Sequence, residues 1–120
     1  MLKNGDFLKI AIVGSRECTQ ADVNTILPYI PENCTEIISG GAMGIDSIAE
    51  AAACALHVPF VCIRPDYKFF GKRAPLVRNC EIARRAELVL AFWNYRSHGT
   101  HHIIQYCVKN DIPIKVIAID

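Results

Sequence analysis

TEIISGGAMGIDSIAEAAACALH, residues 35 to 57, contains the three features that together decide the fold. An apolar, β-branched stretch comes first, a turn with three glycines follows, and an alanine-rich segment that favours helix comes last. Glycine adopts positive φ and lets another group approach the backbone closely, which suits Gly40, Gly41 and Gly44 to a sharp turn. This stretch therefore predicts a β-strand, a glycine loop and a helix in direct succession.

The same succession recurs along the whole chain. Nearly continuous apolar stretches, typical of strands buried on both faces, cover residues 7–14, 35–40, 58–64, 87–93 and 113–119. Helical periodicity occupies the segments between them, residues 19–30, 45–57, 74–86 and 100–110. Thr19 is the expected N-cap of the first helix, which Pro28 should shorten. We therefore predict an α/β fold, a three-layer Rossmann-like domain over residues 1–120, with a five-stranded, mainly parallel sheet and helices on both faces.

Composition limits the possible partners and location. The 120 residues are 52% hydrophobic with a net charge of +1, so the chain is globular and has no overall field that attracts nucleic acid or anionic lipid. Because no apolar run reaches the roughly 20 residues of a membrane span and the start lacks a signal peptide, we expect a cytoplasmic location and no membrane partner. The six cysteines form no CxxC pair, which favours buried free thiols.

Ligands of open parallel sheets bind beyond the carboxyl ends of the strands. The first such end carries Gly14, Ser15 and Arg16, where a hydroxyl and a guanidinium can hold a phosphate or carboxylate. The alternative is a tight turn in which Ser15 caps the next helix and Arg16 lies in solvent.

The second strand ends in the glycine loop quoted above. Gly40 and Gly41 can turn N–H groups outward, and the following helix adds its dipole, so the loop suits an anion. Asp46 either favours that dipole or bonds a ribose hydroxyl. Neither GxGxxG nor GxxxxGKS is present, so we predict neither a dinucleotide cofactor nor a P-loop.

Aromatic and basic residues follow the third strand. Tyr67, Phe69 and Phe70 either stack on a base or form a hydrophobic plug under the loop. Arg78 and Asn79, in the next helix, form a solvent-facing pair when they are considered alone.

The loop after the fourth strand resembles a second phosphate loop. It holds Ser97, Gly99 and Thr100, with Thr100 as the expected N-cap, and Trp93 at the strand end is a candidate for base stacking. His98, His101 and His102 lie close in sequence but lack the spacing of a metal site, so no metal and no cofactor are predicted.

GSR, SGGAMGID, RN and SxGT occur in this order and on these elements, and together they resemble the SLOG superfamily of Rossmann-like nucleotide-binding proteins. That group includes the LOG phosphoribohydrolases and the DNA-processing protein DprA, and the chain looks most similar to small stand-alone members related to YspA and YpsA. The resemblance implies a nucleotide ligand, an Arg78 that points into the cleft, and a homo-oligomer paired through helices. The candidate ligand-binding residues are Gly14, Ser15, Arg16, Ser39, Gly40, Gly41, Ala42, Gly44, Asp46, Arg78, Asn79, Trp93, Ser97, Gly99 and Thr100.

One departure from the LOG enzymes bears on catalysis. Their PGGxGTxxE motif supplies an acidic residue, but here the stretch is YRSHGTHHI and the glutamate position holds Ile103. Because cleaving an N-glycosidic bond usually needs a carboxylate, no catalytic residue is assigned, although Asp46, Asp66 or Glu81 could substitute.

The main prediction is therefore a sensor or binding module for a nucleotide or nucleotide-derived phosphate ligand. The alternatives are a LOG-like hydrolase or transferase of the nucleotide N-glycosidic bond and a DprA-like module for single-stranded nucleic acid. Near-neutral charge argues against nucleic acid, for which only the basic cluster from Lys72 to Arg85 could serve.

Overall fold

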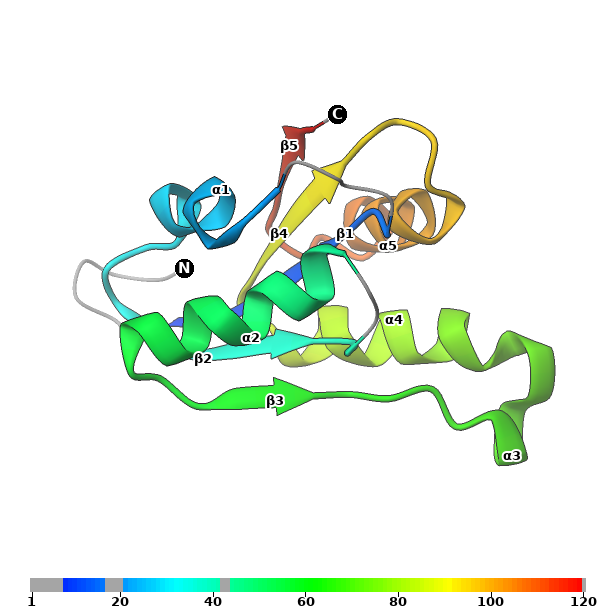
Figure 1. Ribbon diagram of the computed structural model, residues 1–120. Helices are drawn as coiled ribbons and strands as arrows, with labels where there is room; N and C mark the ends of the chain where they lie inside the picture. The colour runs from blue at the N-terminus through cyan, green and yellow to red at the C-terminus, as the bar shows by residue number, and fades with distance from the viewer. Residues whose placement is uncertain (1–7, 17–20, 42–43, 120) are drawn as a thin grey trace.

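The computed structural model describes residues 8–16, 21–41 and 44–119. Its five strands are β1 (Leu8–Gly14), β2 (Cys34–Ser39), β3 (Phe60–Cys62), β4 (Leu88–Trp93) and β5 (Ile114–Ala118). They form one sheet in the order β3-β2-β1-β4-β5, and all four pairings are parallel. The strand ends therefore meet at one edge, called here the carboxyl edge, which lies toward the right of Figure 1.

The helices alternate with the strands, as the sequence predicts. They are α1 (Val23–Ile26), α2 (Ile45–Leu56), α3 (Tyr67–Phe70), α4 (Ala74–Arg85) and α5 (His98–Lys109), with 3₁₀ turns at Leu27–Tyr29 and Gly71–Arg73. The predicted fold class, a Rossmann-like parallel sheet with helices on both faces, is confirmed.

Two helix starts differ from the prediction, and one short helix was not predicted. The first helix is capped by Asp22, whose side chain accepts from the N–H of Asn24, and it turns into the 3₁₀ segment that contains Pro28. Thr19, the expected cap, lies outside the described residues. The last helix begins two residues early because Ser97, and not Thr100, is its N-cap. The short α3 was not predicted, since four residues carry no readable periodicity.

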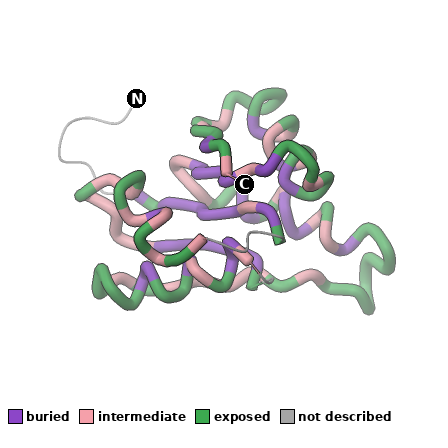
Figure 2. Tube along the Cα trace, turned by 45° about the horizontal axis from the view of Figure 1, so that its top comes forward, coloured by how far each residue is buried: buried purple, intermediate pink, exposed green. Residues whose placement is uncertain are grey.

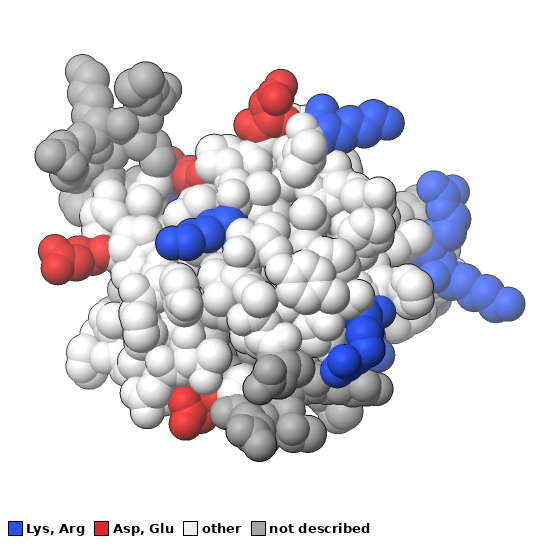
Figure 3. All heavy atoms as spheres, turned by 90° about the horizontal axis from the view of Figure 1, so that it is seen from above, with Lys and Arg blue, Asp and Glu red and all other residues white. Residues whose placement is uncertain are grey.

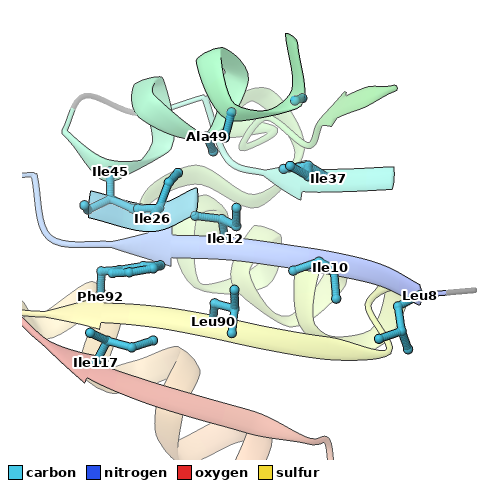
Figure 4. Packing of buried hydrophobic residues seen from close by; sticks show 12 residues of the cluster. Leu8, Ile10, Ile12, Ile26, Ile37, Ile45, Ala49, Leu90, Phe92 and Ile117 are labelled. Atoms are coloured by element: carbon cyan, nitrogen blue, oxygen red, sulfur yellow. The ribbon is translucent and has the colours of Figure 1, made fainter. Parts of the chain in front are cut away.

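Two cores cover the two faces of the sheet. Alternate β1 side chains point to opposite faces, so Ile10 and Ile12 pack in the core under α1 and α2 while Ala11 and Val13 pack in the core under α4 and α5. Figure 4 shows the first core, where Phe92 lies beside its neighbours on the other strands. These cores fix the strand ends in space and thereby position the loops of the carboxyl edge.

The described cysteines are free thiols, but their burial varies. Cys107 is buried and Cys54 is exposed, while Cys34, Cys62 and Cys80 are intermediate. The predicted burial is therefore wrong for Cys54, which lies on the solvent side of α2. Across the described residues, the structure has no helix of the length and apolar character that a bilayer crossing requires.

Candidate functional site

A pocket of about 360 Å³ opens at the carboxyl edge, over the ends of β1 and β4. The chain leaves β1 toward β2 on one side, while β4 lies on its other side, so the pocket marks the point where the strand order reverses. Open α/β sheets bind their ligands at such a point. Its polar lining consists of Ser15, Arg16, Asp46, Arg78, Asn79, Asn94, Arg96, Ser97, His98 and Thr100.

Ser15 joins the two strands under the pocket. Its N–H donates to the carbonyl oxygen of Phe92 at 3.1 Å, and its Oγ accepts from the N–H of Asn94, also at 3.1 Å. Ser15 has no exposed surface, so its hydroxyl braces the loops after β1 and β4 against each other. The neighbouring Arg16 is exposed and lines the pocket.

Asn94 shapes the loop that leads into α5. Its Oδ1 accepts from the N–H of Arg96 at 2.9 Å and from that of Ser97 at 3.0 Å, which folds the chain into a tight turn. Ser97 then caps the helix, because its Oγ accepts from the N–H of Thr100 at 3.3 Å. The N–H groups of His98 and Gly99, in the first turn, have no acceptor among the described residues and face the pocket end of the helix.

Arg78 is held inside the site by neutral oxygen atoms. Only 8% of its surface is exposed; its Nη1 donates to the carbonyl oxygen of Gly40 at 2.9 Å and its Nε to Oδ1 of Asn79 at 3.0 Å. Nδ2 of Asn79 donates in turn to the carbonyl oxygen of Gly99 at 3.3 Å. This chain of bonds ties the glycine loop after β2 to α4 and to the start of α5.

Among the described residues, no carboxylate forms an ion pair with Arg78, although the Asp46 carboxylate acts on its charge. Burial lowers the pKa of Arg78 from its ordinary value because desolvation disfavours the charged form, while the Asp46 carboxylate raises it and the Arg16 charge lowers it further. An arginine so shifted is still charged at neutral pH. The ion pair between two described residues joins Arg85, the last residue of α4, to Glu36 of β2 at 3.3 Å, and neither residue lines the pocket.

The protein's own atoms account for all three glycines of the loop after β2. A Cβ on Gly41, where φ is 71°, would lie 2.5 Å from Sγ of Cys62. A Cβ on Gly40 would lie 2.6 Å from Nη1 of Arg78, and a Cβ on Gly44, where φ is 77°, would lie 2.5 Å from the carbonyl oxygen of Ser15. A Cβ on Gly99 would meet no atom within 4 Å. Among these glycines, Gly99 therefore leaves its backbone open to a ligand.

The structure brings together most of the predicted ligand-binding residues. Those that line the pocket are Gly14, Ser15, Arg16, Asp46, Arg78, Asn79, Ser97, Gly99 and Thr100. Those outside its lining are Ser39, Gly40, Gly41, Gly44 and Trp93, and Ala42 lies outside the described residues. A role in ligand binding stays a prediction for each of them.

Two residues outside the lining have structural contacts instead. The Ser39 hydroxyl donates to the carbonyl oxygen of Ile12 at 2.6 Å within the sheet. The Trp93 indole donates to the carbonyl oxygen of Ser97 at 3.0 Å and stacks on His101 with ring centroids 5.3 Å apart. Within the described residues, no group of three or more His, Cys, Asp or Glu side chains could hold a metal ion.

Sequence reasoning missed Asn94 and Arg96, which also line the pocket. The signal for Asn94 was available: an asparagine directly after a buried strand, at the carboxyl edge, is a common turn former. Three carboxylates were considered as substitutes for the acidic residue of the LOG enzymes. Of these, Asp46 lines the pocket, whereas Asp66 caps α3 and Glu81 is exposed on α4.

Aromatic and basic side chains extend from the pocket onto the segment of residues 66–73, called here the α3 arm. Tyr67 is 58% exposed, Phe69 78% and Phe70 38%, so these rings do not form the alternative hydrophobic plug. Figure 1 shows the arm at the far end of the carboxyl edge, and in Figure 2 much of the chain at this end is coloured green, as exposed.

Positive charge gathers at the carboxyl edge although the chain is nearly neutral. Exposed basic residues on its loops are Arg16, Arg64, Lys68, Lys72, Arg73 and Arg96. In Figure 3 most visible Lys and Arg side chains lie toward the right, where this edge lies, while Asp and Glu lie toward the left and centre. The net charge of the chain therefore did not predict the positive charge of this edge, because it averages the edge with the rest of the surface.

Comparison with known proteins adds the family. Residues 2–66, more than half of the chain, match the family model of DNA recombination-mediator protein A. The chain belongs to this family. The Gene 61 protein of Mycobacterium phage D29 is 34% identical over 84 residues, which cover 65% of this chain and 67% of that protein.

Two solved structures of the DNA recombination-mediator protein A family share the fold. DNA processing protein A (DprA) of Streptococcus pneumoniae superposes with a TM-score of 0.72 at 21% identity, over 92% of this chain and 50% of that one. DNA processing protein A of Helicobacter pylori, whose structure was solved to show its single-stranded DNA binding mode, superposes with a TM-score of 0.71 at 21% identity. The superposition covers 91% of this chain and 64% of that one. The chain thus spans half to just under two thirds of these solved chains.

These matches agree with the part of the predicted resemblance that concerns DprA. The likeness to YspA and YpsA, the homo-oligomer and the cytoplasmic location stay predictions.

Proposed function

We propose that the chain binds single-stranded DNA along its carboxyl edge, with one phosphate in the pocket between β1 and β4. The observation that carries this proposal is Arg78, a cation that is 8% exposed, lines the pocket and, among the described residues, has only neutral hydrogen-bond partners. Buried charges in proteins are normally paired, because an isolated one loses its hydration without compensation. A phosphate in the pocket supplies a negative charge that can pair with Arg78.

The groups around Arg78 suit the same ligand. Arg16 and Arg96 are exposed and line the pocket, so their guanidinium groups can approach phosphate oxygens. The free N–H groups at the start of α5 add backbone donors and the positive end of a twelve-residue helix. The Asp46 carboxylate raises the pKa of Arg78, which favours its charged form, and no ion pair between these two described residues is formed.

The α3 arm favours a strand over an isolated phosphate. Proteins that bind single strands combine a basic track with aromatic rings on which bases stack. Phe69, the most exposed of the arm's rings, lies between basic neighbours at Lys68 and Lys72. A strand whose phosphate occupies the pocket can continue along this arm, and the DNA binding of the Helicobacter pylori relative supports the assignment.

A fluorescence-anisotropy titration with labelled oligothymidines of 5, 10 and 20 nucleotides tests the proposal. We expect affinity to rise with length and to fall as salt rises from 50 to 200 mM, because phosphate contacts release counterions. A 20-base-pair duplex of mixed sequence is the control, since it hides the faces of its bases and should bind more weakly. Absence of binding to every oligonucleotide at 50 mM salt would refute the proposal.

A mononucleotide or nucleotide derivative is the second candidate ligand. The pocket volume of about 360 Å³ favours it, because small-molecule sites begin near this size. Thermal stabilisation by a nucleoside monophosphate, without oligonucleotide binding, would support this function instead. Release of free base from the nucleotide would indicate a hydrolase, with Asp46 as the carboxylate to replace first.

A further inference from the structure

We propose that the pocket selects a phosphate monoester, the group found at the end of a strand, over an internal phosphodiester. This inference rests on the proposed function, since it names which phosphate of the single strand occupies the site.

The charge of the pocket matches a dianion. Three guanidinium groups, from Arg16, Arg78 and Arg96, face the single carboxylate of Asp46, which leaves an excess of two positive charges among the described lining residues. A phosphate monoester carries about −1.5 to −2 charges at neutral pH, whereas an internal diester carries about −1. The monoester therefore neutralises this lining more completely.

The free donors require several ligand oxygens. Two nitrogen atoms of Arg78 already donate within the protein, and the third, Nη2, has no acceptor among the described residues. The N–H groups of His98 and Gly99 are likewise free, and a Cβ on Gly99 would point into open space. A monoester offers three terminal oxygens to these donors, while a diester offers two.

The size of the pocket favours a terminal phosphate of a strand over an internal one. An internal phosphate carries a nucleotide on each side, so reaching the buried Arg78 would draw both neighbours into about 360 Å³. Apolar side chains, among them Leu76, Ile82 and Ile103, occupy part of the wall and offer nothing to a second charged phosphate. A terminal nucleotide enters with its phosphate first and leaves the rest of the strand outside, toward the α3 arm.

Competition separates the two kinds of phosphate. Labelled dT20 is displaced by unlabelled dT8 that carries a 5′-phosphate, a 3′-phosphate or hydroxyls at both ends, and by thymidine monophosphate or thymidine. We expect one phosphorylated dT8 to compete at about tenfold lower concentration than the hydroxyl form, the usual effect of a charge-assisted hydrogen bond, and thereby to identify the end. Thymidine monophosphate should compete and thymidine should not.

Two variants and one control connect the preference to this site. Arg78→Gln should abolish the preference, and Arg16→Ala, on an exposed side chain, should reduce it without affecting folding. Arg84→Gln is the matched control, because Arg84 lies on the same helix but donates to the Tyr106 hydroxyl away from the pocket, and it should keep the preference.

The outcomes distinguish this inference from the proposed function. Equal competition by all three forms of dT8 would overturn the monoester inference and leave single-strand binding intact. Binding of thymidine monophosphate without any binding of dT20 would overturn the proposed function and support the monoester pocket.

Discussion

Replacing Gly40 with alanine removes the space that the Arg78 guanidinium occupies. The new Cβ would lie 2.6 Å from Nη1 and 2.9 Å from Cζ of Arg78, whereas ordinary contact begins at 3.4 Å. The guanidinium must therefore shift by about 0.8 Å, the difference between 3.4 and 2.6 Å, although it is 8% exposed and has little room.

That shift breaks the bond from Nη1 to the Gly40 carbonyl oxygen, which is now 2.9 Å long. A hydrogen bond from a charged group contributes about 1.5 to 3 kcal/mol, so Gly40→Ala should lower the free energy of unfolding by about 1.5 kcal/mol or more. For a chain of this size the melting temperature should fall by roughly 6 °C. Affinity for single-stranded DNA should fall about tenfold, because Arg78 no longer faces the phosphate.

Urea denaturation and DNA titration of four proteins test this reasoning: the wild type, Gly40→Ala, Arg78→Ala and the double variant. If Gly40→Ala acts mainly by displacing Arg78, it should lower the free energy of unfolding by less than about 0.5 kcal/mol once Arg78 is already alanine, because the tight contact that remains is the one to Oδ2 of Asp46 at 3.0 Å. Gly99→Ala, which creates no contact within 4 Å, is the control and should not lower stability. An equal loss of unfolding free energy from Gly40→Ala in the wild type and in Arg78→Ala would refute the account of how Arg78 is held.

Three further predictions concern the arm, the loop after β4 and the buried thiol. Phe69→Ala should weaken oligonucleotide binding by about 1 to 3 kcal/mol but leave the melting temperature unchanged, because the ring is 78% exposed; calorimetric scanning and anisotropy measure the two effects. Asn94→Ala should lower the free energy of unfolding by about 2 kcal/mol, since two backbone N–H groups lose their acceptor, whereas Asn94→Asp should keep most of that stability and weaken DNA binding through its charge. Burial raises the pKa of Cys107 from 9.0 to about 11, so the folded state holds the proton more tightly than the unfolded chain. Stability should therefore be fully present below about pH 9 and fall as pH rises to about 11, by at most roughly 2 to 3 kcal/mol, and urea titrations of Cys107→Val should show a flatter pH dependence.

The sequence allowed the sheet to be predicted because its signal is local. Each strand is a short run of apolar residues, and the alanine-rich segment after Gly44 forms α2 as expected. The α3 arm could not be predicted in this way. Its four-residue helix depends on Asp66, which caps it through a bond to the N–H of Phe69, and not on any periodic pattern.

The site was predictable in location but not in its internal contacts. Strand ends determined where the loops meet, so Arg16 and Gly99 were placed correctly at one edge. The bond from Arg78 to Gly40 spans 38 residues and depends on how α4 packs against the sheet, which no local pattern specifies. For the same reason the glycine loop suggested contact with a ligand, while at Gly40 the nearest atoms belong to the protein's own arginine.

The most direct test of the central claim is the dissociation constant of one dT20, with a phosphate at the end that the competition identifies and the label at the other end, for Arg78→Gln, measured beside the wild type and Arg84→Gln at 50 mM salt. The account predicts that Arg78→Gln weakens binding at least tenfold, as expected for loss of a charge-assisted contact, while Arg84→Gln stays within about twofold of the wild type. Equal weakening by both variants would mean that general positive charge, and not the buried arginine of the pocket, binds the strand. Unchanged affinity in Arg78→Gln, with the fold intact by circular dichroism, would contradict the account.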